Sequence, residues 1–335
     1  MSINNINKLV SVIIPAYNAA SRIKFTLESI INQDYGNIEI ILVNDSSSDD
    51  TELIARQTLS ESNKTFRIIN HEINHGECGS RNTGLRASHG EYICFIDADD
   101  MIKQNFISSL YRTITRYNCE IAFCGLVDRF TDGRPDKNFH SLPNKEPYIT
   151  SGDELILSHS VPPVWCCMYE SNFLTKYNLS FHEGCNAGGD VEFITKALCT
   201  AQRVSFTQEH LYIYMHHNEM GSVRDNDTQS KKILRYEHNT QAQGRTAEYL
   251  LKNSRSELVK ALAERILMPQ VIIRQCNIFA LNNNYDEFKS FIHDPNTRKV
   301  LRSSQSLRVL VHKPEVFLKA LMLLHMPGMY YKLRK

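Results

Sequence analysis

Short apolar runs alternate with amphipathic stretches through the first hundred residues. The runs are rich in β-branched and aromatic residues, are too short for helices, and predict buried strands at Val10–Ile14, Ile38–Val43, Phe66–Asn70 and Tyr92–Ile96. The stretches between them predict helices at Arg22–Gln33, Thr51–Ser60 and Cys78–Ser88. Strands that alternate with helices and are apolar throughout predict an α/β fold, a mainly parallel sheet flanked by helices.

Beyond residue 100 the pattern predicts a helix at Ile102–Tyr117, and mostly helical structure from Ser230 onwards. We therefore expect an α/β domain at residues 1–225, in two parts at 8–118 and 119–225. A helical C-terminal region follows at 226–335 and ends in a basic amphipathic tail.

Three carboxylates, Asp97, Asp99 and Asp100, follow the fourth predicted strand, and Asp45 follows the second. Ligands of doubly wound sheets bind at the carboxyl ends of the strands. Clustered carboxylates repel one another unless a cation lies among them, and Mg²⁺ or Mn²⁺ is held by one or two carboxylates together with substrate phosphates. The cluster predicts a metal–diphosphate site; the alternative is that Asp99 or Asp100 caps the following helix.

Composition and charge narrow the function classes. The formal net charge of +1 gives no reason to expect a nucleic-acid partner. The nine cysteines are scattered, odd in number and without a CxxC pair, which is typical of reduced core cysteines. The polar N-terminus resembles no signal peptide, and no apolar run approaches the ~20 residues needed to cross a bilayer. We therefore expect a cytoplasmic protein.

No Walker-type or GxGxxG glycine motif follows a predicted strand, which disfavours P-loop kinases and dinucleotide oxidoreductases. The segments VSVIIPAYNA, VNDSSSDDT and SRNTGLRASHGEYICFIDADD occur in that order within about 100 residues. They resemble the inverting family 2 glycosyltransferases with the GT-A fold. The stretch from Trp165 to Val223 is similar to that of bacterial lipopolysaccharide and capsule glycosyltransferases. The resemblance covers Val10 to about Val223.

The resemblance implies that residues 1–225 form a catalytic domain, with a nucleotide-binding part at 8–118. It places the base and ribose against Pro15, Ala16, Tyr17 and Asn18. It implies that Asp45 accepts the uracil N–H, although the following serines and aspartates also favour an Asx turn there. It implies that Arg81 meets the diphosphate, for which a guanidinium fork is suited; a surface salt bridge is the alternative.

The Asp97–Asp99 pair is similar to the family's DxD motif. This implies that Asp99 ligates Mn²⁺ or Mg²⁺, that Asp97 contacts the ribose or the metal, and that Asp100 supports them. A divalent cation would stabilise the charge that develops on the departing diphosphate.

The resemblance also implies an acceptor part at residues 119–225. Asp190 is expected to be the catalytic base, although Gly189 replaces the glutamate that usually precedes it, and Glu192 is the weaker candidate. Trp165 either forms the floor below the donor sugar or belongs to the core. His217 is either a ligand to metal or phosphate or an exposed turn residue.

These features predict a metal-dependent glycosyltransferase, and the resemblance implies that it is inverting. It would move a sugar from a nucleotide donor to a glycan or lipid-linked acceptor in bacterial surface polysaccharide synthesis. We expect the donor to be a UDP-sugar. A sugar nucleotidyltransferase and an inactive sugar-nucleotide-binding protein are the alternatives. The basic tail, with Phe317, Tyr330 and Tyr331 among its cations, suits attachment at the cytoplasmic face of the inner membrane; alternatively it closes onto the catalytic domain.

Overall fold

The computed structural model describes residues 7–139, 149–185, 187–217 and 228–334. The chain divides into two compact units, one of residues 1–186 and 193–225 and one of residues 187–192 and 226–335. The expected domain boundary after residue 225 falls outside the described residues. Residues 187–192, which the sequence assigns to the catalytic domain, group with the helical unit.

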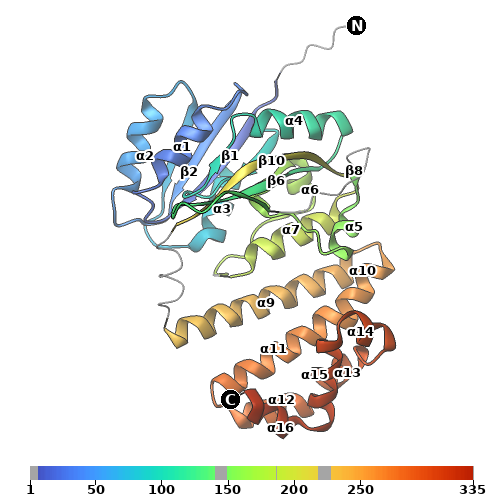
Figure 1. Cartoon of the computed structure of the whole chain (residues 1–335). Coiled ribbons are helices and arrows are strands. Elements are labelled where there is room, and N and C mark those ends of the chain that lie inside the picture. The colour runs from blue at the N-terminus through green and yellow to red at the C-terminus, as the bar shows by residue number, and fades with distance from the viewer. Residues whose placement is uncertain (1–6, 140–148, 186, 218–227, 335) are drawn as a thin grey trace. The chain divides into compact units, whose positions relative to one another are not determined.

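Over the described residues, the first unit is built on a ten-stranded sheet flanked by helices (Figure 1). The strands are β1 (Val10–Ala16), β2 (Ile38–Asn44), β3 (Thr65–Asn70), β4 (Tyr92–Phe95), β5 (Met101–Ile102), β6 (Ile121–Phe130), β7 (Lys137–Phe139), β8 (Ile149–Thr150), β9 (Cys167–Glu170) and β10 (Val204–His216). Their order is β3-β2-β1-β4-β9-β6-β10-β5, with β7 paired to β6 and β8 to β10. The β3-β2-β1-β4 block and the β6-β10 pair are parallel, which confirms the expected mainly parallel α/β fold.

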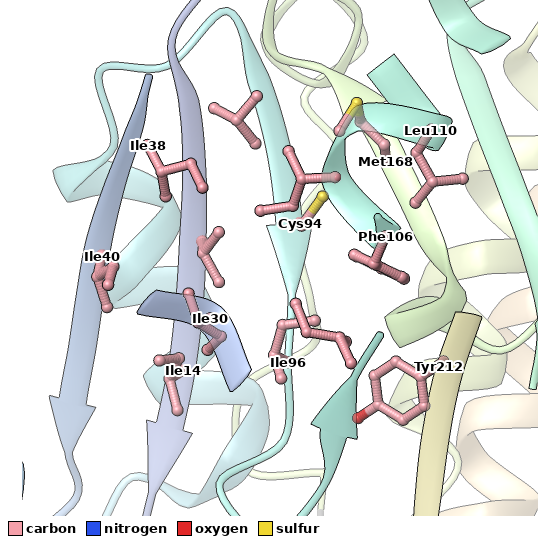
Figure 2. Close-up of a cluster of buried hydrophobic side chains, with 14 of the residues drawn as sticks. Ile14, Ile30, Ile38, Ile40, Cys94, Ile96, Phe106, Leu110, Met168 and Tyr212 are labelled. Carbon is pink, nitrogen blue, oxygen red and sulfur yellow. The ribbon is translucent and has the colours of Figure 1, made fainter. Parts of the chain in front are cut away.

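The helices of this unit are α1 (Ile23–Ile31), α2 (Thr51–Ser60), α3 (Gly76–Ala87), α4 (Phe106–Tyr117), α5 (Gly152–Leu157), α6 (Ser171–Lys176) and most of α7 (Gly189–Thr200), with a 3₁₀ turn at Val164–Cys166. On one face of the sheet, α1 and α4 bury side chains such as Ile30, Phe106 and Leu110 against Ile14 and Cys94 of the strands (Figure 2). Continuous apolar strands are required here because both faces of the sheet are covered.

The opposite face carries an aromatic cluster. Phe95 at the end of β4 contacts Phe181 and Phe193, whose rings stack with centroids 4.1 Å apart, and Tyr169 completes the cluster. On the same sheet α3 packs so closely against β1 that a methyl group at Gly84 would overlap the side chain of Ile13. These contacts anchor α3 and α7 beside the carboxyl end of β4.

The helix expected at Ile102–Tyr117 begins only at Phe106. Met101 and Ile102 instead form β5, which pairs antiparallel with β10, and Asn105 directly precedes the helix. Capping of this helix by Asp99 or Asp100 is therefore wrong, and the aspartates belong to the turn between β4 and β5.

The second unit is helical. It contains α9 (Gln229–Asn253), α10 (Glu257–Leu262), a π-helical turn (Ala263–Leu267), α11 (Met268–Leu281), α12 (Tyr285–His293), α13 (Pro295–Ser303), α14 (Leu307–His312), α15 (Pro314–His325) and α16 (Pro327–Arg334). The basic tail is folded into this unit, where Tyr330 and Tyr331 are buried beside Val316 and Leu323. These tyrosines therefore do not serve as the exposed interfacial aromatics that the sequence suggested.

All nine cysteines are buried, as expected of core cysteines. Burial raises the pKa of the Cys94, Cys166 and Cys167 thiols, and raises that of Cys276 to about 12. Among the described residues, no helix is long and apolar enough to cross a membrane.

Candidate active site

A cavity of about 410 Å³ lies at the carboxyl edge of the sheet, where β1, β2 and β4 end. Seven of the residues singled out in the sequence line it: Pro15, Ala16, Tyr17, Asn18, Asp45, Asp97 and Asp99. Their convergence follows from topology, because β1 lies between β2 and β4 and all three strands run in the same direction.

The loop after β1 is fixed by the loop after β2. Asn18 adopts a left-handed backbone conformation with φ of 47°. Its side-chain oxygen accepts a hydrogen bond from the Ser48 N–H at 2.9 Å, and its own N–H donates to Ser47 Oγ at 3.0 Å. Asp49 Oδ2 accepts the Ala20 N–H at 3.0 Å. The serine- and aspartate-rich turn therefore holds the segment 17–20 along one side of the cavity.

Asp45 is buried and lines the cavity. Its Oδ1 accepts the His75 N–H at 2.9 Å and lies 2.7 Å from His71 Nδ1, and its Oδ2 accepts the Gly76 N–H at 2.8 Å. Gly76 begins α3 with φ of +74°, a conformation that glycine adopts without strain. Asp45 thus holds the start of α3 while it faces the cavity.

Arg81 does not line the cavity. Its side chain is fully buried on α3, with Nη2 2.7 Å from Asp97 Oδ1, a second ion pair to Glu77, and the guanidinium over the Phe181 ring. The surface salt bridge considered for Arg81 is wrong, because the guanidinium is fully buried, although its partner Glu77 is half exposed. The guanidinium fixes the carboxylate of Asp97 at the cavity wall.

The three aspartates after β4 have different surroundings. Asp100 is buried, with Oδ2 2.7 Å from the Tyr212 hydroxyl and Oδ1 accepting the Met215 N–H at 2.8 Å. Burial, followed by the charges of Asp97 and Asp99, raises the pKa of Asp100 well above its usual value. Asp100 thus joins the β4–β5 turn to β10.

Asp99 is partly exposed. No hydrogen bond or ion pair to its carboxylate is present in the described part of the chain. It lines both the first cavity and a neighbouring one of about 500 Å³, which is also bordered by Phe25, Met215 and His217. His217 Nε2 lies 3.2 Å from the Asp99 backbone oxygen. Mg²⁺ and Mn²⁺ prefer oxygen ligands, and the accessible carboxylate of Asp99 offers them. The site around Asp99 therefore fits a divalent cation.

The described residues contain no group of three or more His, Cys, Asp or Glu side chains placed to hold a metal ion by themselves. A Mg²⁺-type site needs only one or two carboxylates when the phosphates of the substrate complete the shell.

Trp165 stacks on Tyr214, with ring centroids 6.3 Å apart, and Tyr214 lines the first cavity. The indole therefore packs against a residue that lines the cavity. Its Nε1 is buried without a hydrogen-bond partner among the described residues.

Asp190 lies in the first turn of α7 and is partly exposed. Phe193, one turn later in the same helix, packs against Phe95, two residues before Asp97. Glu192 is buried and held by Arg245, whose Nη2 and Nε lie 2.7 and 3.0 Å from Glu192 Oε2. Glu192 thus has a structural partner within the helical unit.

Several cavity residues escaped the sequence analysis: Arg22, Asn74, Gly76, Glu77, Ser80 and Tyr214. Ser80 Oγ is buried and has no hydrogen-bond partner within the described ranges. The position of Asn74, shortly after β3, was the available signal, because that strand ends at the same edge of the sheet.

A model of glycosyl transferase family 2 matches residues 11–194. The chain belongs to this family. It is 30% identical over 258 residues to the uncharacterized glycosyltransferase YibD of Escherichia coli, covering 75% of this chain and 73% of YibD. It is 32% identical over 213 residues to the uncharacterized glycosyltransferase EpsJ of Bacillus subtilis, covering 62% of this chain and 60% of EpsJ.

The minor teichoic acid biosynthesis protein GgaB of Bacillus subtilis is 25% identical to this family 2 member over 308 residues, covering 88% of this chain and 33% of GgaB. The crystal structure of S. aureus TarS residues 1–349 with UDP-GlcNAc matches with a TM-score of 0.69 at 20% identity, over 97% of this chain and 91% of the other. A Pyrobaculum calidifontis mannosyltransferase with GDP-Man and Mn²⁺ matches with a TM-score of 0.54 at 13% identity, over 97% and 85%. At these identities the two structures establish the fold.

Proposed function

We propose that this protein is a metal-dependent inverting glycosyltransferase that transfers a sugar from a UDP-sugar to a glycan or lipid-linked acceptor in bacterial cell-surface polysaccharide synthesis. One observation carries the proposal. A single cavity joins a hydrogen-bond acceptor suited to a base, Asp45, to an accessible carboxylate suited to a cation, Asp99. The fold match to TarS with UDP-GlcNAc and the likeness to GgaB support the donor and the pathway.

Each residue has a distinct proposed task. Asp45 accepts the imino hydrogen of the base, and Pro15–Asn18 contact base and ribose. Asp99, with Asp97, would hold Mn²⁺ or Mg²⁺. When bound, the cation supplies Lewis-acid stabilisation of the departing diphosphate. Arg81 is buried and its guanidinium pairs with Asp97, so we assign it the task of holding Asp97 in place.

Asp190 is the proposed catalytic base. The acceptor hydroxyl oxygen bonds to the anomeric carbon, the bond from that carbon to the diphosphate oxygen breaks, and the hydroxyl proton passes to the Asp190 carboxylate. The nucleoside diphosphate leaves. We expect Asp190→Asn to slow transfer by about a hundredfold while binding of UDP is unchanged, because the base touches the acceptor and not the nucleotide. Equal loss of binding and rate would contradict this role.

The first experiment measures release of nucleoside diphosphate from a panel of UDP-, GDP- and dTDP-sugars, with Mn²⁺, with Mg²⁺ and with chelator, for wild type and Asp99→Ala. Slow hydrolysis of one UDP-sugar, lost on chelation and in the variant, supports the proposal. Release of pyrophosphate from a sugar phosphate and a nucleoside triphosphate would identify a nucleotidyltransferase. Metal-dependent UDP binding without hydrolysis or transfer would favour an inactive binding protein, and absence of UDP binding would exclude the proposal.

We also propose that the helical tail contacts an anionic membrane surface. Its most exposed apolar side chains are Leu307, Val311, Leu318, Met329 and Leu333, at 51–76% exposure. Cations lie beside them in the same helices, at Arg308, Lys319, Lys332 and Arg334, and none of these has an ion-pair partner among the described residues. Apolar side chains interspersed with cations suit a surface of anionic lipid.

Cosedimentation with vesicles tests the tail. Binding to vesicles that contain phosphatidylglycerol, absent with phosphatidylcholine alone and weakened in Leu307→Gln and Leu333→Gln, supports the contact. Equal recovery in the supernatant with both lipids would exclude it.

A further inference from the structure

His71 directly follows β3, at the same edge of the sheet as Asp45. Its N–H donates to the Asn44 oxygen at 2.9 Å, and only 11% of its side chain is exposed. Nδ1 lies 2.7 Å from Asp45 Oδ1, and Nε2 lies 3.0 Å from Thr83 Oγ1 on α3. The imidazole therefore links the cavity carboxylate to the helix that forms one wall of the cavity.

The partners assign the tautomer of His71. The ionised carboxylate of Asp45 only accepts hydrogen bonds, so Nδ1 carries the hydrogen. The Thr83 hydroxyl accepts a hydrogen bond from Arg86 Nη2 at 3.0 Å, which leaves its own hydrogen for His71 Nε2. Both ring nitrogens thus have a defined role, and the ring is fixed at both ends.

The acceptor capacity of Asp45 can then be counted. Its two oxygens together accept about four hydrogen bonds. Oδ1 receives His71 Nδ1–H and His75 N–H, and Oδ2 receives Gly76 N–H. Among the described residues this leaves one acceptor position, on Oδ2, in a residue that lines the cavity.

A single remaining acceptor discriminates between bases. Uracil, thymine and guanine present a ring N–H that it can receive. Cytosine presents a lone pair at the corresponding ring nitrogen, which the carboxylate repels. A buried carboxylate that faces a lone pair strongly disfavours binding of that base, because neither group recovers the hydrogen bond to water that it has lost.

We propose that His71 is a positioning residue that sets nucleobase selectivity through Asp45. By occupying Oδ1 and fixing the rotation of the carboxylate, it restricts ligand contact to Oδ2. Without the imidazole, Oδ1 regains an open acceptor position, water can enter beside it, and the carboxylate is held by two backbone N–H groups only. This inference rests on the proposed nucleotide site and adds the residue that makes it selective.

Equilibrium binding of UDP and of CDP, each with Mn²⁺, tests the proposal in the full chain. Wild type should prefer UDP. His71→Leu should lower the ratio of the two affinities about tenfold, because a hydrogen bond to a charged group is lost. His71→Asn is the matched control, since its amide nitrogen can occupy the place of Nδ1 and should preserve most of the ratio. Thr83→Val, which removes only the partner of Nε2, should lower it about threefold.

The ratio separates positioning from a purely structural role. If His71→Leu weakens UDP and CDP by the same factor, or if His71→Leu and Thr83→Val both keep the wild-type ratio, the proposal is overturned. Thermal melting of each variant identifies one that does not fold, in which case Thr83→Val and His71→Asn decide. Wild type that binds no UDP would refute the proposed function itself, whereas a UDP preference unaffected by His71 would refute only this inference.

Discussion

Each of the two edges of the sheet holds a carboxylate, and the surroundings of that carboxylate differ between the two edges. At the amino edge, Glu39 Oε1 accepts hydrogen bonds from Ser11 Oγ at 2.5 Å, the His89 N–H at 2.6 Å and the Gly90 N–H at 3.1 Å. At the carboxyl edge, Asp99 stands beside two further aspartates, and the described residues offer its carboxylate no donor.

The difference indicates which carboxylates serve the fold and which serve a ligand. Donors from the protein stabilise Glu39, whereas Asp97, Asp99 and Asp100 repel one another at close range. An arrangement that lowers stability is retained where function requires it. Substitution of Asp99 should therefore reduce activity without loss of stability, and substitution of Glu39 should reduce stability without loss of activity.

The largest expected effect is at Asp99. Asp99→Asn should reduce transfer or donor hydrolysis about a thousandfold, because the charge that would hold the cation is lost. The midpoint of thermal unfolding should stay the same or rise, because one of three like charges is removed. Activity and melting curves measured on one preparation check both halves, and a large fall in the midpoint would contradict the comparison.

Arg81 is the next test, since its buried guanidinium pairs with Asp97. Arg81→Met should lower the free energy of unfolding by about 3 kcal/mol, because it leaves a carboxylate without its cation. Denaturant unfolding measures this, and Arg81→Lys, which keeps the charge but loses the fork, should cost less. Full stability with lost UDP binding would instead favour the contact with the diphosphate that the family resemblance implies.

A smaller effect is expected at Glu39. Glu39→Gln should lower the free energy of unfolding by about 2 kcal/mol, because hydrogen bonds to a charged acceptor become bonds to a neutral one. Donor hydrolysis at a temperature well below the unfolding midpoint should match wild type. Reduced activity of the folded variant would break the distinction between the two edges.

The smallest expected effect is a pH dependence of the difference in unfolding free energy between wild type and Glu39→Gln. Burial alone would raise the pKa of Glu39, but hydrogen bonds from Ser11 and His89 outweigh it and lower the pKa below its ordinary value. A lowered pKa in the folded state stabilises the protein above the unfolded pKa of about 4.3, and this contribution is lost as the pH falls through the folded value. The stability gap between wild type and Glu39→Gln should thus be constant above about pH 5.5 and close below about pH 4. A gap that widened on acidification would be inconsistent with the lowered pKa.

Much of the first unit could be predicted from local sequence. The strands at Val10, Ile38 and Tyr92 begin where the apolar runs begin, since buried parallel strands carry a continuous apolar signal. Their common direction then places Pro15–Asn18, Asp45 and Asp97–Asp99 around one cavity. The family motifs named these residues, and the topology brings them together.

Long-range contacts account for what was missed. The two-residue strand β5 exists only because β10, more than a hundred residues later, pairs with it. The burial of Arg81 depends on Phe181, and that of Tyr330 and Tyr331 on helices that a basic, amphipathic sequence does not specify. Local pattern shows that a segment has an apolar face but not what covers that face.

Because every cysteine is buried, the native thiols can serve as probes of local unfolding. A thiol-specific reagent can react only where the chain exposes a sulfur, so in the native protein the rate of labelling measures how often a region unfolds. Cys276 is the only cysteine of the helical unit, and the others belong to the unit with the sheet. Mass spectrometry of peptides can identify the thiols that are modified first. The order of modification would therefore show whether the two units unfold together or separately, with no engineered probe.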